Sequence, residues 1–288
     1  MNEETDINII KLEKQIKVIR QKLERSETNR AILEDVKDAN QKLLKKVNLE
    51  VEEARATIER QNEELVKLYA ELEIEKQKAE NLLLNILPFK IAGELKAAGK
   101  VTAVYFESAT VLFTDIVGFT KMSKLLDEKR LVEALDDCFC AFDEIVKKRG
   151  LEKIKTIDDS YMCAGGLPET NSTHPFDAVM AALEMQDAVS ERKRKKASAG
   201  EFYWDIRLGI HTGPLIAGVV GKNKFAYDVW GTTVNTASRM ESSGEAGRIN
   251  ISGATYELVK DRFTTEPRGK VLAKNMGEIE MYFVNGVK

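Results

Sequence analysis

The opening stretch of the chain carries a helical pattern of hydrophobic positions. Neither proline nor glycine, the residues that most readily interrupt a helix, occurs before Pro88 and Gly93. Apolar or small residues recur at alternating spacings of three and four, which is the heptad pattern of a coiled coil. This apolar seam runs through Ile9, Leu12, Ile16, Ile19 and Leu23, and again through Val51, Ala54, Ile58, Leu65, Leu68, Leu72, Ala79, Leu82 and Ile86. Gln61 and Glu75 occupy two further positions of its second part.

One apolar stripe on a helix of about 80 residues, or about 120 Å, cannot be buried by that helix alone. Residues 1–86 are therefore predicted to form a parallel coiled coil with a second chain. The register slips near residues 33–36 and 47–51, and Asn40 lies near the seam, so the coil is expected to be only moderately stable. Two roles fit this helix, namely dimerisation and the transmission of a signal.

The hydrophobic period changes after a short connecting element at residues 87–102, in which Pro88 breaks the helix and Gly99 ends the next one. Residues 103–288 alternate between strand-like and helix-like runs in the order β, α, β, β, α, β, with additions at the end. Helices are expected over residues 121–150 and 174–196. This order predicts an α+β domain built on a ferredoxin-like split unit.

Composition and charge narrow the class of protein. A hydrophobic content of 43% is ample for a buried core, and a net charge of −3 gives no global attraction for nucleic acid. The basic run at residues 191–196 ends a predicted helix, where cations favour the helix dipole. Three cysteines without metal-ligand spacing, no signal peptide and no membrane-spanning run predict a cytoplasmic protein.

The first candidate for chemistry is the segment TVLFTDIVGFT, in which Asp115 ends an apolar strand and Gly118 follows in the turn. A carboxylate at a strand end can hold Mg²⁺, and a glycine-containing turn can present backbone N–H groups to phosphate. The alternative is that Asp115 simply caps the following helix.

A second acidic element is the turn of LEKIKTIDDSYM, which carries Asp158 and Asp159 between two strand-like runs. If a hairpin holds Asp159 beside Asp115, the two carboxylates can bridge two cations about 4 Å apart, as in phosphoryl transfer. The alternative is that the two aspartates only form a turn.

The third element, YDVWGTTVNTASRMES, reads as a strand that turns at Gly231 into a helix. Asn235 and Arg239 lie one helical turn apart on the same face of that helix. Together they can hold a ribose and the charge that develops on a phosphoryl group. The alternative is a helix-surface arginine and a capping asparagine.

These three elements, together with LGIHTGPLIAGVVG, GGLP and the late EIEMYFV, resemble the class III adenylate and guanylate cyclase catalytic domain over residues 104–285. Several motifs agreeing in order and separation make chance convergence improbable. The resemblance implies two Mg²⁺ or Mn²⁺ ions per site and a set of residues around ATP. By this resemblance, Asp115, Asp159 and the backbone of Ile116 are expected to bind the metals, and Asn235 and Arg239 to act on the ribose and the transition state. The phosphates are expected to contact Gly118, Phe119, Thr120 and Lys274.

Purine choice in this family rests on two positions, occupied here by Lys155 and Asp228. Lysine can donate to the adenine ring and aspartate can accept from its exocyclic amine, whereas guanylate-selective members typically carry Glu and Cys there. The resemblance therefore implies an adenylate cyclase, and alternatives are a guanylate cyclase or a nucleotide-binding regulatory module with weak turnover. A scaffold that neither binds nor turns over nucleotide is disfavoured, since it has no need of all these side chains.

Family members build each site from two chains, with metal ligands from one and the base-reading and transition-state residues from the other. Because this chain holds both sets, the resemblance implies a homodimer with two identical sites. The coiled coil implies input from an upstream receptor or sensory domain. Asp158 stands where the family usually has glycine, in a turn expected to need a glycine-like backbone conformation.

Overall fold

The structure is a computed structural model that describes residues 3–123, 127–198, 203–221 and 225–288, with side chains from residue 8 onward. It divides into two compact units, residues 1–79 and residues 80–288.

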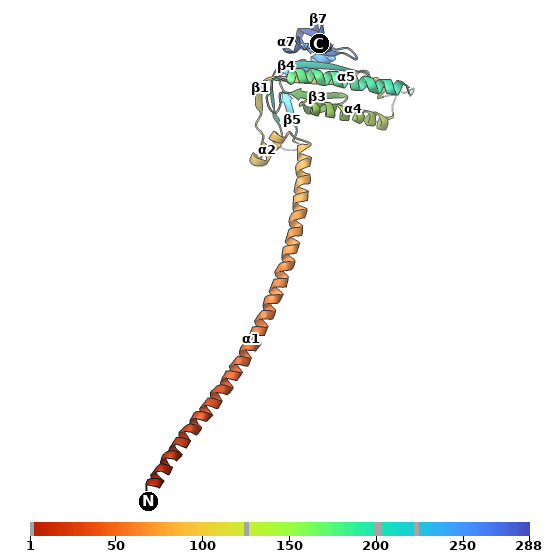
Figure 1. Ribbon diagram of the computed structural model, residues 1–288. Coiled ribbons are helices and arrows are strands. Elements are labelled where there is room, and N and C mark those ends of the chain that lie inside the picture. Colours follow the sequence, from red (N-terminus) through yellow and green to blue (C-terminus); the bar gives the residue numbers. More distant parts are fainter. Residues whose placement is uncertain (1–2, 124–126, 199–202, 222–224) are drawn as a thin grey trace. The chain divides into compact units, whose positions relative to one another are not determined.

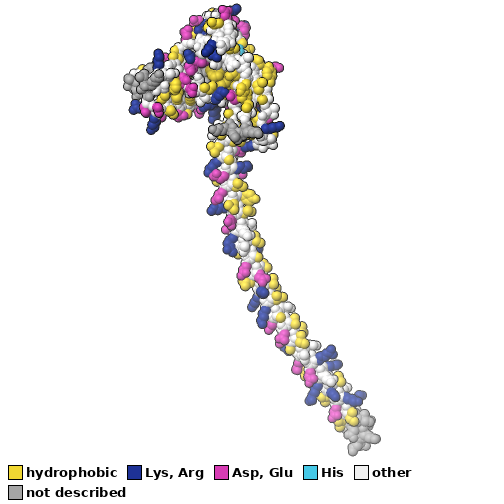
Figure 2. Space-filling view, turned by 180° about the vertical axis from the view of Figure 1, so that it is seen from behind, with side chains coloured by type: hydrophobic (Ala, Val, Ile, Leu, Met, Phe, Trp, Pro, Cys, Tyr) yellow, Lys and Arg dark blue, Asp and Glu magenta, His cyan; other side chains and the backbone are white. Residues whose placement is uncertain are grey.

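The first unit is a single uninterrupted helix. Helix α1 (Glu3–Leu84) continues beyond the unit, and every described side chain from residue 8 to residue 79 is exposed. The exposed side chains include those of the predicted seam, such as Leu65 at 51% and Leu72 at 62%. Figure 2 shows hydrophobic side chains along the helix among Lys, Arg, Asp and Glu. The long helix is therefore present, and within one chain its apolar positions stay uncovered.

The second unit is a mixed sheet with helices, shown in Figure 1. Its elements after α1 are α2 (Phe89–Ala98), β1 (Val104–Ile116), α3 (Phe119–Met122), α4 (Glu128–Lys148), β2 (Glu152–Ile157), β3 (Ser160–Gly165), α5 (His174–Ser198), β4 (Ile206–Val219), β5 (Tyr227–Trp230), α6 (Thr232–Ser242), β6 (Ile249–Ser252), α7 (Gly253–Val259), β7 (Phe263–Ala273) and β8 (Gly277–Val287). Among the described residues the strands follow the order β2-β3-β1-β4-β6-β8-β7, with β5 paired to β4.

The first four strands have the ferredoxin-like arrangement that the sequence predicts. Strand β1 lies between β3 and β4 and runs antiparallel to both, while β2 pairs only with β3 within this group. The one parallel pairing in the described sheet joins β4 to β6, which begins the C-terminal addition. The predicted α+β class is thereby confirmed.

Alternate residues of the central strands enter two separate cores, as the period of two in a strand requires. Leu112 of β1 packs with α4 and α5, whereas its neighbours Val111 and Phe113 pack with α2, β5 and α6. Both faces of β1 are therefore covered, which explains why ATVLF is a continuous apolar run rather than an alternating one.

Three local features refine the sequence expectations. The helix expected over residues 121–150 is α4, preceded by the one-turn α3, and residues 124–126 lie outside the described residues. The connecting segment forms α2, which ends at Gly99 with a left-handed φ of 68°. Within the described ranges no helix combines the length and apolar character that crossing a bilayer requires.

Candidate active site

The carboxylates predicted to bind metal converge at one end of β1. Thr114 pairs with Tyr161, so the β2–β3 hairpin turn lies beside the end of β1, as expected for the two acidic elements. The hydroxyl of Ser160 donates to Asp115 Oδ1 at 3.1 Å. Burial and the nearby charge of Asp115 raise the pKa of Asp159. The Asp115 carboxylate is thus close enough for its charge to oppose the ionisation of Asp159.

The turn itself depends on Asp158. Ile157 pairs with Ser160, which leaves Asp158 and Asp159 as the two turn residues, and Asp158 has a positive φ of 52°. The first of two hairpin-turn residues with a positive φ is a position that glycine favours, and aspartate is among the side chains that tolerate it best. The hairpin therefore forms with Asp158 in the strained position.

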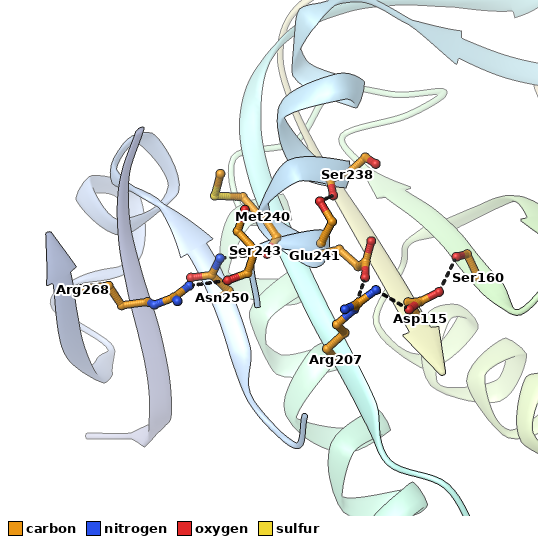
Figure 3. A network of polar contacts seen from close by, with 10 residues as sticks. Asp115, Ser160, Arg207, Ser238, Met240, Glu241, Ser243, Asn250 and Arg268 are labelled. Atoms are coloured by element: carbon orange, nitrogen blue, oxygen red, sulfur yellow. Dashed lines mark hydrogen bonds and ion pairs between the residues drawn. The ribbon is translucent and has the colours of Figure 1, made fainter. Parts of the chain in front are cut away.

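An arginine that the sequence analysis did not single out lies beside Asp115, one of the two predicted metal ligands. Arg207 is the register partner of Asp115 in β4, and its Nη2 donates to Asp115 Oδ2 at 2.7 Å. Its Nε donates to Glu241 of α6, and Figure 3 shows the guanidinium between the two carboxylates. Although burial lowers the pKa of Arg207, Glu241 and Asp115 raise it, so the group is a fixed cation.

The backbone around Asp115 is arranged for a tight turn. The side chain of Ile116 is buried in the core with the main helices, which leaves only its backbone for ligation. Gly118 has a left-handed φ of 81° and precedes α3, where Phe119 is partly buried and Thr120 is exposed. The amide of Val117 is already used, since it donates to Asp205 O at 2.9 Å. Gly118, Phe119 and Thr120 therefore form the turn and the start of the short helix that directly follow β1 and Asp115.

The two positions expected to read the purine form an ion pair. Lys155 Nζ of β2 lies 2.6 Å from Asp228 Oδ2 of β5, and Asp228 Oδ1 accepts from the amide of Val229 at 2.8 Å. The lysine side chain is 40% exposed and the aspartate 22%. Residues far apart in the sequence thus present a donor and an acceptor side by side, with part of each open to solvent.

Helix α6 presents Asn235 and Arg239 on faces other than that of Glu241. Asn235 is exposed and Arg239 is partly buried, and neither side chain bonds another described residue. Arg239 and Glu241 are two positions apart, which is about 200° around a helix, and Asn235 lies about 240° from Glu241. Because Glu241 contacts Arg207, Arg239 faces roughly the opposite side of α6, and Asn235 faces a flank about 120° from Glu241 the shorter way round.

Lys274 lies in the turn between β7 and β8 and is exposed. The hydroxyl of Thr236 on α6 contacts Met276 Sδ at 3.9 Å, which places this turn beside the same helix. Asn275 has a positive φ of 64° and Gly277 one of 76°, so a tight hairpin turn directs Lys274 outward. The structure therefore puts Lys274 in a turn that lies beside α6.

The comparisons with known proteins now decide the family. Residues 101–286 match the model of the adenylate and guanylate cyclase catalytic domain. The chain belongs to this family. An adenylate cyclase of Mycobacterium tuberculosis is 40% identical over 220 residues, covering 76% of this chain and 49% of that protein. Human atrial natriuretic peptide receptor 2 is 38% identical over 253 residues, covering 87% of this chain and 24% of that protein. The cyclase chain therefore spans half or less of the length of these curated relatives.

Solved cyclase structures share its fold. The guanylate cyclase domain of RhGC from Catenaria anguillulae, in complex with GTP, has a TM-score of 0.61 and 36% identity over 64% of this chain and 100% of its own. The adenylyl cyclase CyaB from P. aeruginosa has a TM-score of 0.62 and 30% identity over 65% of this chain and 97% of its own. The chain thus contains a nucleotidyl cyclase catalytic domain, with relatives named for either purine.

Two functional candidates, Arg207 and Glu241, were missed from the sequence. Arg207 is a charged residue inside the apolar strand run WDIRLGIHTG, and Glu241 is a carboxylate that is 8% exposed at the end of α6. A charge within an otherwise buried strand is the one signal that could have identified Arg207.

Proposed function

We propose that this chain is an adenylate cyclase that converts ATP into 3′,5′-cyclic AMP and pyrophosphate. The observation that carries the choice of ATP is the Lys155–Asp228 ion pair. Lysine can donate to a ring nitrogen of adenine, and aspartate can accept from its exocyclic amine. The catalytic core of a rhodopsin-guanylyl cyclase with converted specificity, in complex with ATPαS, is 38% identical to this chain with a TM-score of 0.60. That complex supports the proposal that this fold can bind an ATP-like nucleotide.

The donor set at the end of β1 fits divalent cations. Asp115 and Asp159 are two oxygen donors whose mutual repulsion is relieved by a bound cation, and the backbone of Ile116 can add a third. Across the described residues, no group of three or more His, Cys, Asp or Glu side chains could hold a metal ion alone. The site therefore suits ions that share their coordination with nucleotide phosphates, as Mg²⁺ and Mn²⁺ do, with two per site proposed.

We propose that the working enzyme is a homodimer with sites shared between chains. Asn235 and Arg239 lie on other faces of α6 than Glu241, which contacts the partner of Asp115, and this supports a role for them at another chain's predicted metal ligands. Lys274 lies beside the same helix and joins this set. Parallel pairing of α1 through its exposed apolar seam would hold the two chains together. The same helix offers a route for input from an upstream receptor or sensory domain.

In the proposed reaction, the ribose 3′-oxygen bonds to the α-phosphorus as the bond from that phosphorus to pyrophosphate breaks, and the 3′-hydroxyl proton leaves to solvent. Asp115 and Asp159 would hold the divalent cations, which would supply Lewis acidity toward the attacking and leaving oxygens. Asn235 orients the ribose, and Arg239 stabilises the charge on the phosphoryl group in flight. Gly118, Phe119 and Thr120 contact the phosphates beside Asp115, and Lys274 contacts the terminal phosphates.

The three free cysteines fit a reducing compartment, and we propose that the enzyme acts in the cytoplasm. Burial raises the pKa of the thiols of Cys138 and Cys163, so neither is a reactive thiolate at neutral pH.

The deciding experiment is an assay of the purified chain with ATP, and separately GTP, in Mg²⁺ and in Mn²⁺, with the Asp115→Ala variant as control. Cyclic AMP formed only by the unmutated chain supports the proposal. Cyclic GTP as the main product would identify a guanylate cyclase. Nucleotide binding without either product would support a regulatory module instead.

A further inference from the structure

Arg207 is held between carboxylates from two different elements. The β1–β4 register places it opposite Asp115, and α6 approaches β4 closely enough at Gly209 for Glu241 to reach the guanidinium. Nη2 faces Asp115 and Nε faces Glu241, as Figure 3 shows. One cation is therefore shared between a metal-binding carboxylate and a helix carboxylate.

The Glu241 carboxylate is buried, and its described ion-pair partner is Arg207. Burial and the charge of Asp115 raise the pKa of Glu241 to about 7, although Arg207 acts in the opposite direction. Buried carboxylates are rare unless they are paired, and each one requires a reason. Anchoring the end of α6 is an insufficient reason, because other side chains already do so. Asn250 Nδ2 donates to Met240 O at 2.7 Å, and Arg268 Nη1 donates to Ser243 O at 2.8 Å.

We propose that Glu241 is a positioning residue for the metal site and acts through Arg207. The inference rests on the proposed function, since it takes Asp115 as a metal ligand. Without a divalent cation, Arg207 neutralises Asp115. A cation that binds Asp115 competes with Arg207 for its oxygens, and Glu241 keeps the guanidinium paired when Arg207 yields. Glu241 therefore lowers the free energy needed to free Asp115 for a cation.

The direction of the effect follows from charge. Glu241→Gln keeps the shape and one acceptor oxygen but removes the negative charge that competes with Asp115 for Arg207. Arg207 then pairs more strongly with Asp115, which makes Asp115 harder to free for a cation and so weakens cation binding. Arg207→Met removes the competing cation and should do the reverse.

The test is Mn²⁺ binding to the purified full chain without nucleotide, followed by electron paramagnetic resonance. Binding that is lost in Asp115→Ala defines the site. We expect Glu241→Gln to weaken this binding about fivefold and Arg207→Met to tighten it. In the Arg207→Met background, Glu241→Gln should change affinity by less than about twofold, because its intermediary is gone.

Glu245→Gln is the matched control, because Glu245 follows α6 closely but is 62% exposed in its pair with Arg268. It should leave Mn²⁺ affinity unchanged. Equal weakening by Glu241→Gln with and without Arg207, or no weakening at all, overturns the proposal. If Glu241→Gln does not fold, the Arg207→Met variant alone tests the proposal. Unchanged or weaker Mn²⁺ binding by Arg207→Met would contradict the proposal. Mn²⁺ binding that survives Asp115→Ala would instead refute the proposed metal site.

Discussion

Lys155 and Asp228, 73 positions apart in the chain, are joined by an ion pair 2.6 Å long between β2 and β5. The pair keeps a donor and an acceptor side by side. Such preorganisation favours the base whose edge offers the complementary acceptor and donor.

We predict that the double variant Lys155→Glu with Asp228→Cys reverses purine choice. Exchanging donor and acceptor should lower kcat/KM for ATP by at least about 100-fold while GTP becomes the better substrate. Competition between the two nucleotides in one assay gives the ratio directly. Lys153→Glu, on the same strand but paired with Asp143, is the matched control and should leave the ratio unchanged. A double variant that still prefers ATP would show that other contacts read the base.

Shared sites predict complementation between inactive variants. Asp115→Ala and Arg239→Ala should each abolish cyclic AMP formation by homodimers. After mixing and subunit exchange, half of the dimers should be mixed and each should hold one intact site, which restores about a quarter of wild-type activity. Mixing Asp115→Ala with Asp159→Ala is the control and should restore nothing, because both changes damage the same half of a site. Activity that returns in neither mixture would argue for sites within single chains.

Asp158 should be replaceable by glycine but not by a β-branched residue. Its φ of 52° strains a side chain branched at Cβ, so Asp158→Val should lower the free energy of unfolding by about 1–2 kcal/mol. Asp158→Gly relieves strain but adds freedom to the unfolded chain, so its effect should stay within about 1 kcal/mol. Chemical denaturation measures both, with Asp158→Asn as the control that keeps a tolerant side chain. If Asp158→Val left the free energy of unfolding unchanged, the turn would have to adopt another conformation.

Gly209 should resist even a single added methyl group. A Cβ there would collide with the backbone of Met240 and Glu241, so α6 would have to move. We expect Gly209→Ala to lower the free energy of unfolding by about 1–3 kcal/mol and to reduce turnover, because α6 carries Asn235 and Arg239. Gly93→Ala in α2 is the control: it meets no atom within 4 Å and should be neutral or stabilising. Equal effects at both positions would contradict the close packing of α6 on β4.

The seam of α1 should control self-association. The double variant Leu65→Asn with Leu72→Asn places two polar groups in the predicted coiled-coil core. It should raise the dimer dissociation constant at least about tenfold in sedimentation experiments. Val66 is 69% exposed but lies off the seam, so Val66→Asn is the matched control. Loss of association in the control alone would place the contact on another face of the helix.

Much of the second unit followed from local pattern. Asp115 at the end of an apolar strand, the Asp158–Asp159 turn and the strand-to-helix turn at Gly231 all stand where the sequence predicts. Less was foreseen at the C-terminal end, where α7 and most of the β7–β8 hairpin lack a clear period in the sequence. The split into α3 and α4 was also missed, since both segments share one helical pattern.

The sequence by itself determined the long helix, the α+β order of elements and the main candidate residues, because periodicity and turn chemistry act between near neighbours along the chain. Only the tertiary structure decided that Arg207 stands between Asp115 and Glu241, or that Lys155 meets Asp228. Asp115 and Arg207 are 92 positions apart, and Arg207 and Glu241 are 34 apart. Their meeting depends on strand register and on how closely α6 packs on β4, which are set by long-range packing of the whole sheet.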